Sequence, residues 1–158
     1  NRAAMAIGFG VDLHRLVPGR RLVLGGVEIP YPLGLLGHSD GDAVLHAVID
    51  ALLGAAGEGD IGTKFPDTDP TYKGVSSDLL LSKVMDDLRK KWKVVNVDIT
   101  VLAEEPKIAP YREAIRLKIA SRIGTDRVSI KGKTMEGLGS IGAREAIAAY
   151  AVAQLEPL

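Results

Sequence analysis

The stretch that most constrains the fold is residues 36–55, LGHSDGDAVLHAVIDALLGA, because its second half carries one apolar stripe. The stripe follows the i, i+3, i+4, i+7, i+8 spacing of one helix face and consists of Leu45, Val48, Ile49, Leu52 and Leu53. Gly54 is expected to end this helix. Because such a stripe must be buried against another apolar layer, the rest of the chain has to supply that layer.

Alternating segments on both sides of this helix predict the strands of a sheet. Strands are expected at residues 5–16, as a hairpin around Gly25 and Gly26, at 94–103 and at 127–134. In the 94–103 segment one face is expected to carry Val95, Val97, Ile99 and Val101.

Further helices are expected from Ser77 to Trp92, from Pro110 to Gly124 and over residues 143–155, AREAIAAYAVAQL. Residues 57–74 are rich in Gly, Pro and Asp and predict a long loop. This order predicts an α+β fold: a single domain over 5–158 with a mixed sheet and helices packed on one face. Residues 1–4 could be an artificial addition and stand outside that domain.

Composition excludes several classes of function. The 158 residues contain 20 Lys and Arg against 20 Asp and Glu, so no electrostatic footprint for nucleic acid or an anionic membrane is expected. There is no cysteine, which excludes thiolate metal sites. No apolar run approaches the roughly 20 residues of a membrane span. The expected location is the cytoplasm, or a plastid if a transit peptide has been removed.

Two of the three histidines in the chain can form a metal site with an aspartate. Asp12 and His14 lie two apart in a strand, so their side chains leave the same face. His46 lies at the edge of the helix stripe and could be aimed at that pair. Two imidazoles and one carboxylate suit Zn²⁺ with an open fourth position. The alternative is that His14 and His46 are two separate, half-buried histidines.

The loop before this helix has a structural explanation as well as a functional one. Ser39 and Asp42 have the spacing of a capping box, and Asp42 could also orient the ring of His46. His38 gains nothing for the helix by being histidine. It would lie beside free backbone N–H groups that attract phosphate.

Five motifs taken in order carry a resemblance that covers nearly the whole chain from Met5. They are DLH at 12–14, HSDGDAVLH at 38–46, GDIGTKFPDTDP at 59–70, EEPKIAPY at 104–111 and KTMEGLG at 133–139. In this order and at these separations they resemble the 2-C-methyl-D-erythritol 2,4-cyclodiphosphate synthase family.

The resemblance implies a reaction and its metals. The substrate would be 4-diphosphocytidyl-2-C-methyl-D-erythritol 2-phosphate, whose 2-phosphate attacks the β-phosphorus of its own diphosphate and expels CMP. Asp12, His14 and His46 match the zinc ligands, and Glu136 matches the ligand of a second ion, Mg²⁺ or Mn²⁺. His38 and Thr134 match the positions that hold and stabilise the reacting phosphates.

The resemblance also implies the substrate-binding residues and a homotrimer with active sites at subunit boundaries. Ser39 is among the implied substrate-binding residues. The ribose and methylerythritol segments match Asp60, Ile61, Gly62, Phe65, Pro66, Asp67, Thr68 and Asp69. The cytosine and phosphate segments match Ala103, Glu104, Glu105, Pro106, Lys107, Ile108, Ala109, Lys133 and Met135. The chain departs from many members at Met135, which concerns the fit around the phosphates. It also departs at Ser140 and Ala143–Arg144, in the region that in the family lines a central cavity of the trimer able to bind an isoprenoid diphosphate.

Two other functions remain open. A zinc-dependent phosphohydrolase would activate water at the same metal, and Asp42 would be its candidate general base. A non-catalytic trimer that binds cytidine nucleotides would bind CMP without turnover.

Overall fold

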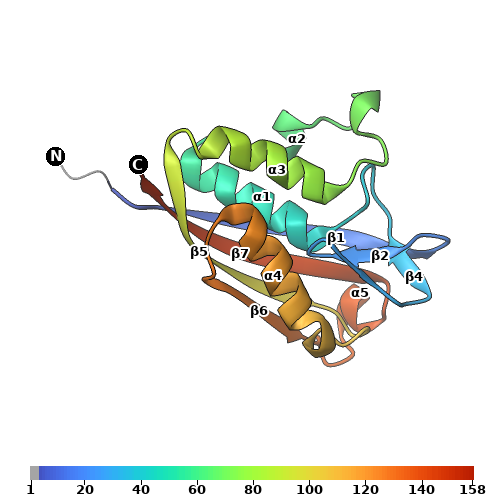
Figure 1. Ribbon diagram of the computed structural model, residues 1–158. Coiled ribbons are helices and arrows are strands. Elements are labelled where there is room, and N and C mark those ends of the chain that lie inside the picture. Colours follow the sequence, from blue (N-terminus) through green and yellow to red (C-terminus); the bar gives the residue numbers. More distant parts are fainter. Residues whose placement is uncertain (1–3) are drawn as a thin grey trace.

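The computed structural model describes residues 4–158. The expectation about residues 1–4 therefore concerns residues that lie, except for residue 4, outside the described part of the chain. Five strands form the main sheet in the order β4-β1-β7-β5-β6, and helices cover one of its faces (Figure 1). The strands are β1 (Ala6–Pro18), β2 (Leu22–Leu24), β3 (Val27–Ile29), β4 (Leu33–Leu35), β5 (Trp92–Leu102), β6 (Val128–Lys133) and β7 (Ala146–Pro157). The helices are α1 (Ala43–Ala56), α2 (Ile61–Lys64), α3 (Ser77–Leu88), α4 (Arg112–Ile123) and α5 (Gly139–Gly142), with short 3₁₀ turns η1 (Pro70–Tyr72) and η2 (Ala109–Tyr111).

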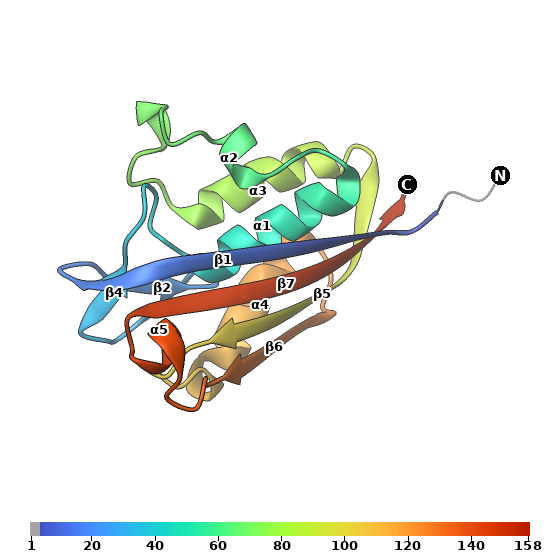
Figure 2. The same cartoon turned by 180° about the vertical axis from the view of Figure 1, so that it is seen from behind.

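The sheet is mixed, because β5 and β6 run parallel while the other neighbours are antiparallel. Strands β2 and β3 pair as a separate hairpin. Helices α1, α3 and α4 lie on one side, and Figure 2 shows the strands of the opposite side without a covering layer of long helices. The predicted α+β domain with a mixed sheet and helices on one face is therefore confirmed.

The last predicted helix is wrong, because residues 146–157 form strand β7 between β1 and β5. Its burial alternates: Ala149, Ala151 and Ala153 are buried, while Tyr150 and Val152 between them are exposed. The helix propensity of alanine is worth only tenths of a kcal/mol per residue, and pairing on both edges overrides it. Small side chains on the buried face also leave room for α1.

Two helix ends, the 57–74 segment and one strand face also differ from the sequence prediction. Helix α3 ends at Leu88, and Trp92 instead begins β5. Helix α1 continues past Gly54, and Gly57 ends it with a left-handed φ of 70°. The 57–74 segment contains α2 and η1 rather than an unbroken loop. A bulge between Val94 and Asn96 takes Val95 off the buried face, so the buried residues of β5 are Val94, Val97, Ile99 and Val101.

Helix α1 lies unusually close to β1 because the strand has glycine beneath it. A Cβ built on Gly8 would lie 1.8 Å from the carbonyl oxygen of Ala51, and one on Gly10 would lie 1.9 Å from that of Ala47. No other residue type fits at these two positions without moving the helix. Close packing of α1 on β1 brings the side chains of the two elements within reach of one another.

None of the described helices is long and apolar enough to cross a membrane.

Candidate active site

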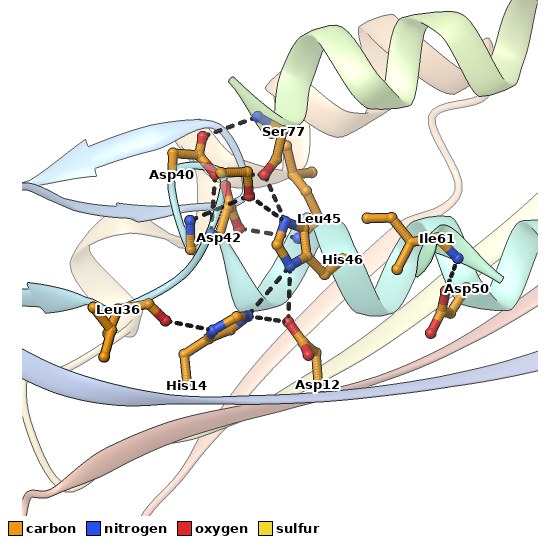
Figure 3. Close-up of polar contacts among 12 residues, drawn as sticks. Asp12, His14, Leu36, Asp40, Asp42, Leu45, His46, Asp50, Ile61 and Ser77 are labelled. Carbon is orange, nitrogen blue, oxygen red and sulfur yellow. Dashed lines mark hydrogen bonds and ion pairs between the residues drawn. The ribbon is translucent and has the colours of Figure 1, made fainter. Parts of the chain in front are cut away.

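The structure brings Asp12 and His14 of β1 together with His46 of α1 (Figure 3). Oδ2 of Asp12 lies 2.6 Å from Nε2 of His14 and 3.0 Å from Nδ1 of His46, and those two ring nitrogens are 3.3 Å apart. One ligand atom from each residue therefore points at a common centre. Two separate histidines, the alternative from sequence, do not describe this arrangement.

The opposite nitrogen of each ring has its own partner. Nδ1 of His14 donates to the carbonyl oxygen of Leu36 at 2.7 Å, which leaves Nε2 with a lone pair when the ring is neutral. Nε2 of His46 lies 2.8 Å from Oγ of Ser77 and 3.0 Å from Oγ of Ser39. Both rings thus have outer contacts of the kind that orient metal-ligating histidines.

The contacts within the cluster shift the pKa values of Asp12 and His14 in opposite directions. Burial acts to raise the pKa of Asp12, but hydrogen bonds from His14 and His46 outweigh it and hold that pKa at about 2. Burial acts to lower the pKa of His14, and the hydrogen bond to Asp12 outweighs it, so the pKa of His14 is raised. A carboxylate that stays ionised between two imidazoles is a donor set able to bind a cation.

The geometry of the cluster suits a metal ion. Four donors placed tetrahedrally at about 2.0–2.1 Å from Zn²⁺ lie roughly 3.3 Å from one another. Two separations in the cluster, 3.3 and 3.0 Å, lie close to that spacing, and the third, 2.6 Å between Asp12 and His14, is clearly shorter. Asp12, His14 and His46 can therefore hold a divalent cation and leave one coordination position for a ligand.

The predicted role of Asp42 beside His46 is wrong. Its carboxylate is fully buried and accepts three backbone N–H groups, from Leu45 at 3.0 Å, Gly25 at 2.9 Å and Gly26 at 2.7 Å. Burial raises the pKa of Asp42 to about 6, although these three donors act to lower it. Asp42 is itself the N-cap of α1 and also holds the turn of the β2–β3 hairpin, so the predicted capping box, in which Ser39 would be the cap, is wrong.

Ser77 and Leu36, which contact the rings of His46 and His14, are not among the residues predicted from the sequence. The only signal for Ser77 was its place at the start of a predicted helix. A backbone carbonyl such as that of Leu36 carries no sequence signal at all.

A cavity of about 260 Å³ opens beside the three ligand atoms. His38 lines it and lies at the loop before α1, with Nε2 3.4 Å from the carbonyl oxygen of Asp69. The structure gathers nine of the predicted residues on this wall, namely Asp12, His14, His38, Ser39, His46, Ile61, Gly62, Phe65 and Asp67.

A second cavity, of about 270 Å³, lies at the ends of β5 and β6. It gathers another set of predicted residues, namely Ala103, Glu104, Pro106, Lys107, Ile108, Ala109, Lys133 and Thr134. Leu13, the neighbour of His14 in β1, and Lys133 belong to one row of paired residues that crosses β1, β7, β5 and β6. Three strand spacings of about 4.8 Å put the two sets roughly 14 Å apart along the sheet of one chain.

The other predicted residues have contacts of their own. Asp60 and Asp69 cap α2 and η1, and the hydrogen bonds from Thr63 and Thr71 lower the pKa values of these two carboxyls. Oε1 of Glu104 accepts the backbone N–H of Met135 at 2.6 Å. Glu105 pairs with Arg144 at 3.2 Å, and Pro66 and Thr68 lie between α2 and η1.

Glu136 is exposed and has a φ of 55°, a left-handed conformation that glutamate rarely adopts. Glycine would avoid the strain, which is of order 1–2 kcal/mol. Strained residues of this kind concentrate at functional sites.

Comparison with known proteins identifies the family of the chain. Residues 5–156 match the sequence model of the YgbB family. The chain is 56% identical over 153 residues to 2-C-methyl-D-erythritol 2,4-cyclodiphosphate synthase of Dechloromonas aromatica (strain RCB), covering 95% of this chain and 96% of that one. Its fold is similar to the CDP complex of IspF from Plasmodium falciparum, with a TM-score of 0.86, 36% identity and 99% of both chains covered.

The chain is also similar to part of a longer protein. It matches the bifunctional IspDF of Campylobacter jejuni with a TM-score of 0.94 and 38% identity, covering 99% of this chain but 43% of that one. The family match spans nearly all of the chain, and the relatives are well above 30% identical. The chain therefore belongs to the YgbB family, together with the 2-C-methyl-D-erythritol 2,4-cyclodiphosphate synthases.

Proposed function

We propose that residues 5–158 form one catalytic domain that converts 4-diphosphocytidyl-2-C-methyl-D-erythritol 2-phosphate into 2-C-methyl-D-erythritol 2,4-cyclodiphosphate and CMP, in non-mevalonate isoprenoid biosynthesis. The observation that carries this proposal is the convergence of Asp12, His14 and His46 beside a cavity that His38 also lines. The relative in Dechloromonas aromatica bears the name of this activity.

The reaction is an intramolecular phosphoryl transfer. An oxygen of the 2-phosphate attacks the β-phosphorus, a new P–O bond closes the ring, and the bond from the β-phosphorus to the bridging oxygen breaks so that CMP leaves. The attacking phosphate is already largely ionised at pH 7, so neither a protein nucleophile nor a strong base is required. What the protein must supply is positioning and neutralisation of charge.

Residues of the metal-side cavity have distinct roles in this proposal. Asp12, His14 and His46 would hold Zn²⁺, which when bound supplies a Lewis acid to a phosphate oxygen. His38, on the wall of the same cavity, would donate a hydrogen bond to a reacting phosphate. Asp60 and Gly62 would hold the ribose, while Phe65 through Asp69 would surround the methylerythritol part.

Residues of the second cavity would complete the site. Ala103 through Ala109 would hold the cytosine, largely through backbone groups, and Lys107 would lie near the phosphates. Thr134 would bind a reacting phosphate. Glu136 would ligate Mg²⁺ or Mn²⁺ together with phosphate oxygens, since Mg²⁺ is usually held by one or two carboxylates, phosphates and water.

We propose further that the active form is a homotrimer in which neighbouring chains join the two cavities. The uncovered face of the sheet supports this, because it carries the exposed side chains of Ile7, Phe9, Val11, Leu13, Tyr150 and Val152. Contiguous exposed apolar surface of this kind marks protein interfaces. Each chain would then offer its metal to one neighbour and its base pocket to the other.

The phosphohydrolase alternative is weakened by the structure around Asp42. That carboxylate is buried and held by three backbone donors, so it cannot serve as general base for a water at the metal. Phosphorus NMR of the purified, zinc-loaded protein with the named substrate distinguishes the three functions. The proposal predicts CMP and a cyclic diphosphate in equal amounts. A linear product would establish hydrolysis, and bound but unconverted nucleotide would establish a binding protein.

A further inference from the structure

We propose that Ser77 and Asp40 form a positioning pair that fixes the proton on Nε2 of His46 and thereby turns the lone pair of Nδ1 toward the metal. The inference rests on the metal-binding role of His46 proposed above. Nδ1 of His46 faces Asp12 in the proposed metal site, whereas Ser77 contacts the opposite nitrogen, Nε2. Ser77 and Asp40 would therefore act on the metal only through the ring of His46.

A chain of hydrogen bonds runs from the ring to the carboxylate (Figure 3). Oγ of Ser77 lies 2.8 Å from Nε2 of His46 and also contacts Oδ1 of Asp40 closely. The backbone N–H of Ser77 donates to Oδ2 of the same carboxylate at 3.0 Å, and the N–H of Asp42 donates to Oδ1 at 3.1 Å. Asp40 is thus an acceptor in all of these contacts.

The direction of the protons follows from this chemistry. An ionised carboxylate has no proton to give, so the hydroxyl of Ser77 donates to Asp40. That hydroxyl has only one proton, and its oxygen is then left to accept from Nε2–H of His46. A neutral imidazole protonated on Nε2 has its lone pair on Nδ1, the atom that lies 3.0 Å from Asp12. The carbonyl of Leu36 fixes His14 in the same way.

The side chain of Ser77 is not needed to cap α3. The N-cap of that helix is Ser76, whose Oγ accepts the backbone N–H of Leu79 at 3.2 Å. Ser77 is fully buried, whereas Ser76 is exposed. Adjacent serines therefore have different tasks: Ser76 stabilises the helix and Ser77 contacts the ring.

Ser39 also contacts Nε2 of His46, at 3.0 Å. It accepts a long contact from the N–H of Gly41 at 3.5 Å and lines the metal-side cavity. Because Ser39 remains as a second acceptor, removal of Ser77 should weaken the orientation of His46 without abolishing it.

The experiment compares Ser77→Ala with Ser76→Ala in the full-length protein. The dissociation constant for Zn²⁺ alone is measured by competition with a chromogenic chelator, and ¹H–¹⁵N NMR of the zinc-loaded protein follows the Nε2 proton of His46. Loss of an outer contact typically weakens metal binding by about 10- to 100-fold. We expect Ser77→Ala to lie at the lower end of that range and to shift or lose the Nε2–H signal. Ser76→Ala should lower the melting temperature while both metal readouts stay as in wild type.

Each outcome decides the inference. Equal zinc affinity in Ser77→Ala and wild type, or an equal loss in Ser76→Ala, would overturn it while leaving the metal site intact. If wild type itself binds no zinc, the proposed metal site is wrong and the inference falls with it. If Ser77→Ala does not fold, Asp40→Asn is measured instead. This variant puts an amide donor beside the N–H of Ser77 and should bind zinc at least threefold more weakly than wild type. Wild-type zinc affinity in Asp40→Asn would also overturn the proposed positioning pair.

Discussion

Nε2 of His14 lies 3.3 Å from Nδ1 of His46, and the two rings meet at an interplanar angle of 67°. Two nitrogen lone pairs that face each other at this distance repel unless a proton or a cation lies near both. The separation is set by the packing of α1 against β1, which the glycines at 8 and 10 permit. Metal binding is therefore linked to the close packing of α1 on β1.

Replacement of His46 by alanine should remove the metal and leave a folded protein. His46 is 9% exposed, and its loss leaves the hydroxyls of Ser39 and Ser77 without their partner, so unfolding should become easier by about 1–3 kcal/mol. Zinc content by mass spectrometry and a thermal unfolding curve measure the two effects. One zinc per chain in the purified variant would contradict the assignment.

His38→Ala should keep the metal but lower the turnover. Its ring lines the cavity, and it is not one of the three clustered ligand residues, so zinc content should equal that of wild type. If His38 donates to a reacting phosphate, the barrier should rise by about 2–4 kcal/mol, the range found for a preorganised donor. Wild-type turnover in the metal-loaded variant would limit His38 to a structural role.

Asp42→Asn should destabilise the fold and leave the metal site chemically unchanged. An amide oxygen can replace one carboxylate oxygen, but the NH₂ group would face a backbone N–H, so one buried donor loses its acceptor. The expected cost is about 1–3 kcal/mol in free energy of unfolding, measured by urea denaturation. An unchanged midpoint would show that the hairpin turn and the start of α1 do not depend on this carboxylate.

The ion pair between Asp78 of α3 and Arg122 of α4 predicts a pH dependence. Its two hydrogen bonds, 2.8 and 2.7 Å long, lower the pKa of Asp78. A lowered pKa in the folded state contributes stability above the unfolded value of about 3.9, and this contribution is lost as the pH falls through the folded pKa.

Wild type should therefore be more stable than Asp78→Asn at pH 5–8, and the difference should shrink below about pH 4. Because the guanidinium is 41% exposed, solvent screens the pair and the difference should be small. Asp87→Asn, which alters an exposed pair with Lys90, is the matched control. A difference that grows as the pH falls would contradict this reading of the ion pair.

Much of the site could be predicted from sequence because its key spacings are local. Asp12 and His14 share a strand face by simple alternation, and His46 follows from the helix stripe. The contacts of the Asp42 carboxylate could not be predicted, because its partners Gly25 and Gly26 belong to a separate hairpin.

The wrong helix over residues 143–155 has a similar cause. Alanine-rich segments favour a helix locally, whereas their burial here is decided by β1 and β5 on either side and by α1 above. The same limit applies to Ser77, because its contact with His46 spans 31 residues and depends on how α3 packs against α1. Pairing across the chain, rather than propensity, determines both.

The central claim is that the metal cavity of one chain and the base pocket of its neighbour form one reaction centre, and mixing two inactive variants tests it most directly. His46→Ala removes the metal half, and Lys107→Ala with Thr134→Ala removes the pocket half. After equal amounts are unfolded together and reassembled at random, three-quarters of the trimers are mixed, and each mixed trimer contains one site with both halves intact. About a quarter of all sites should then release CMP, although neither parent does. If mixed trimers form and remain as inactive as both parents, each chain must contain a complete site and the claim is wrong.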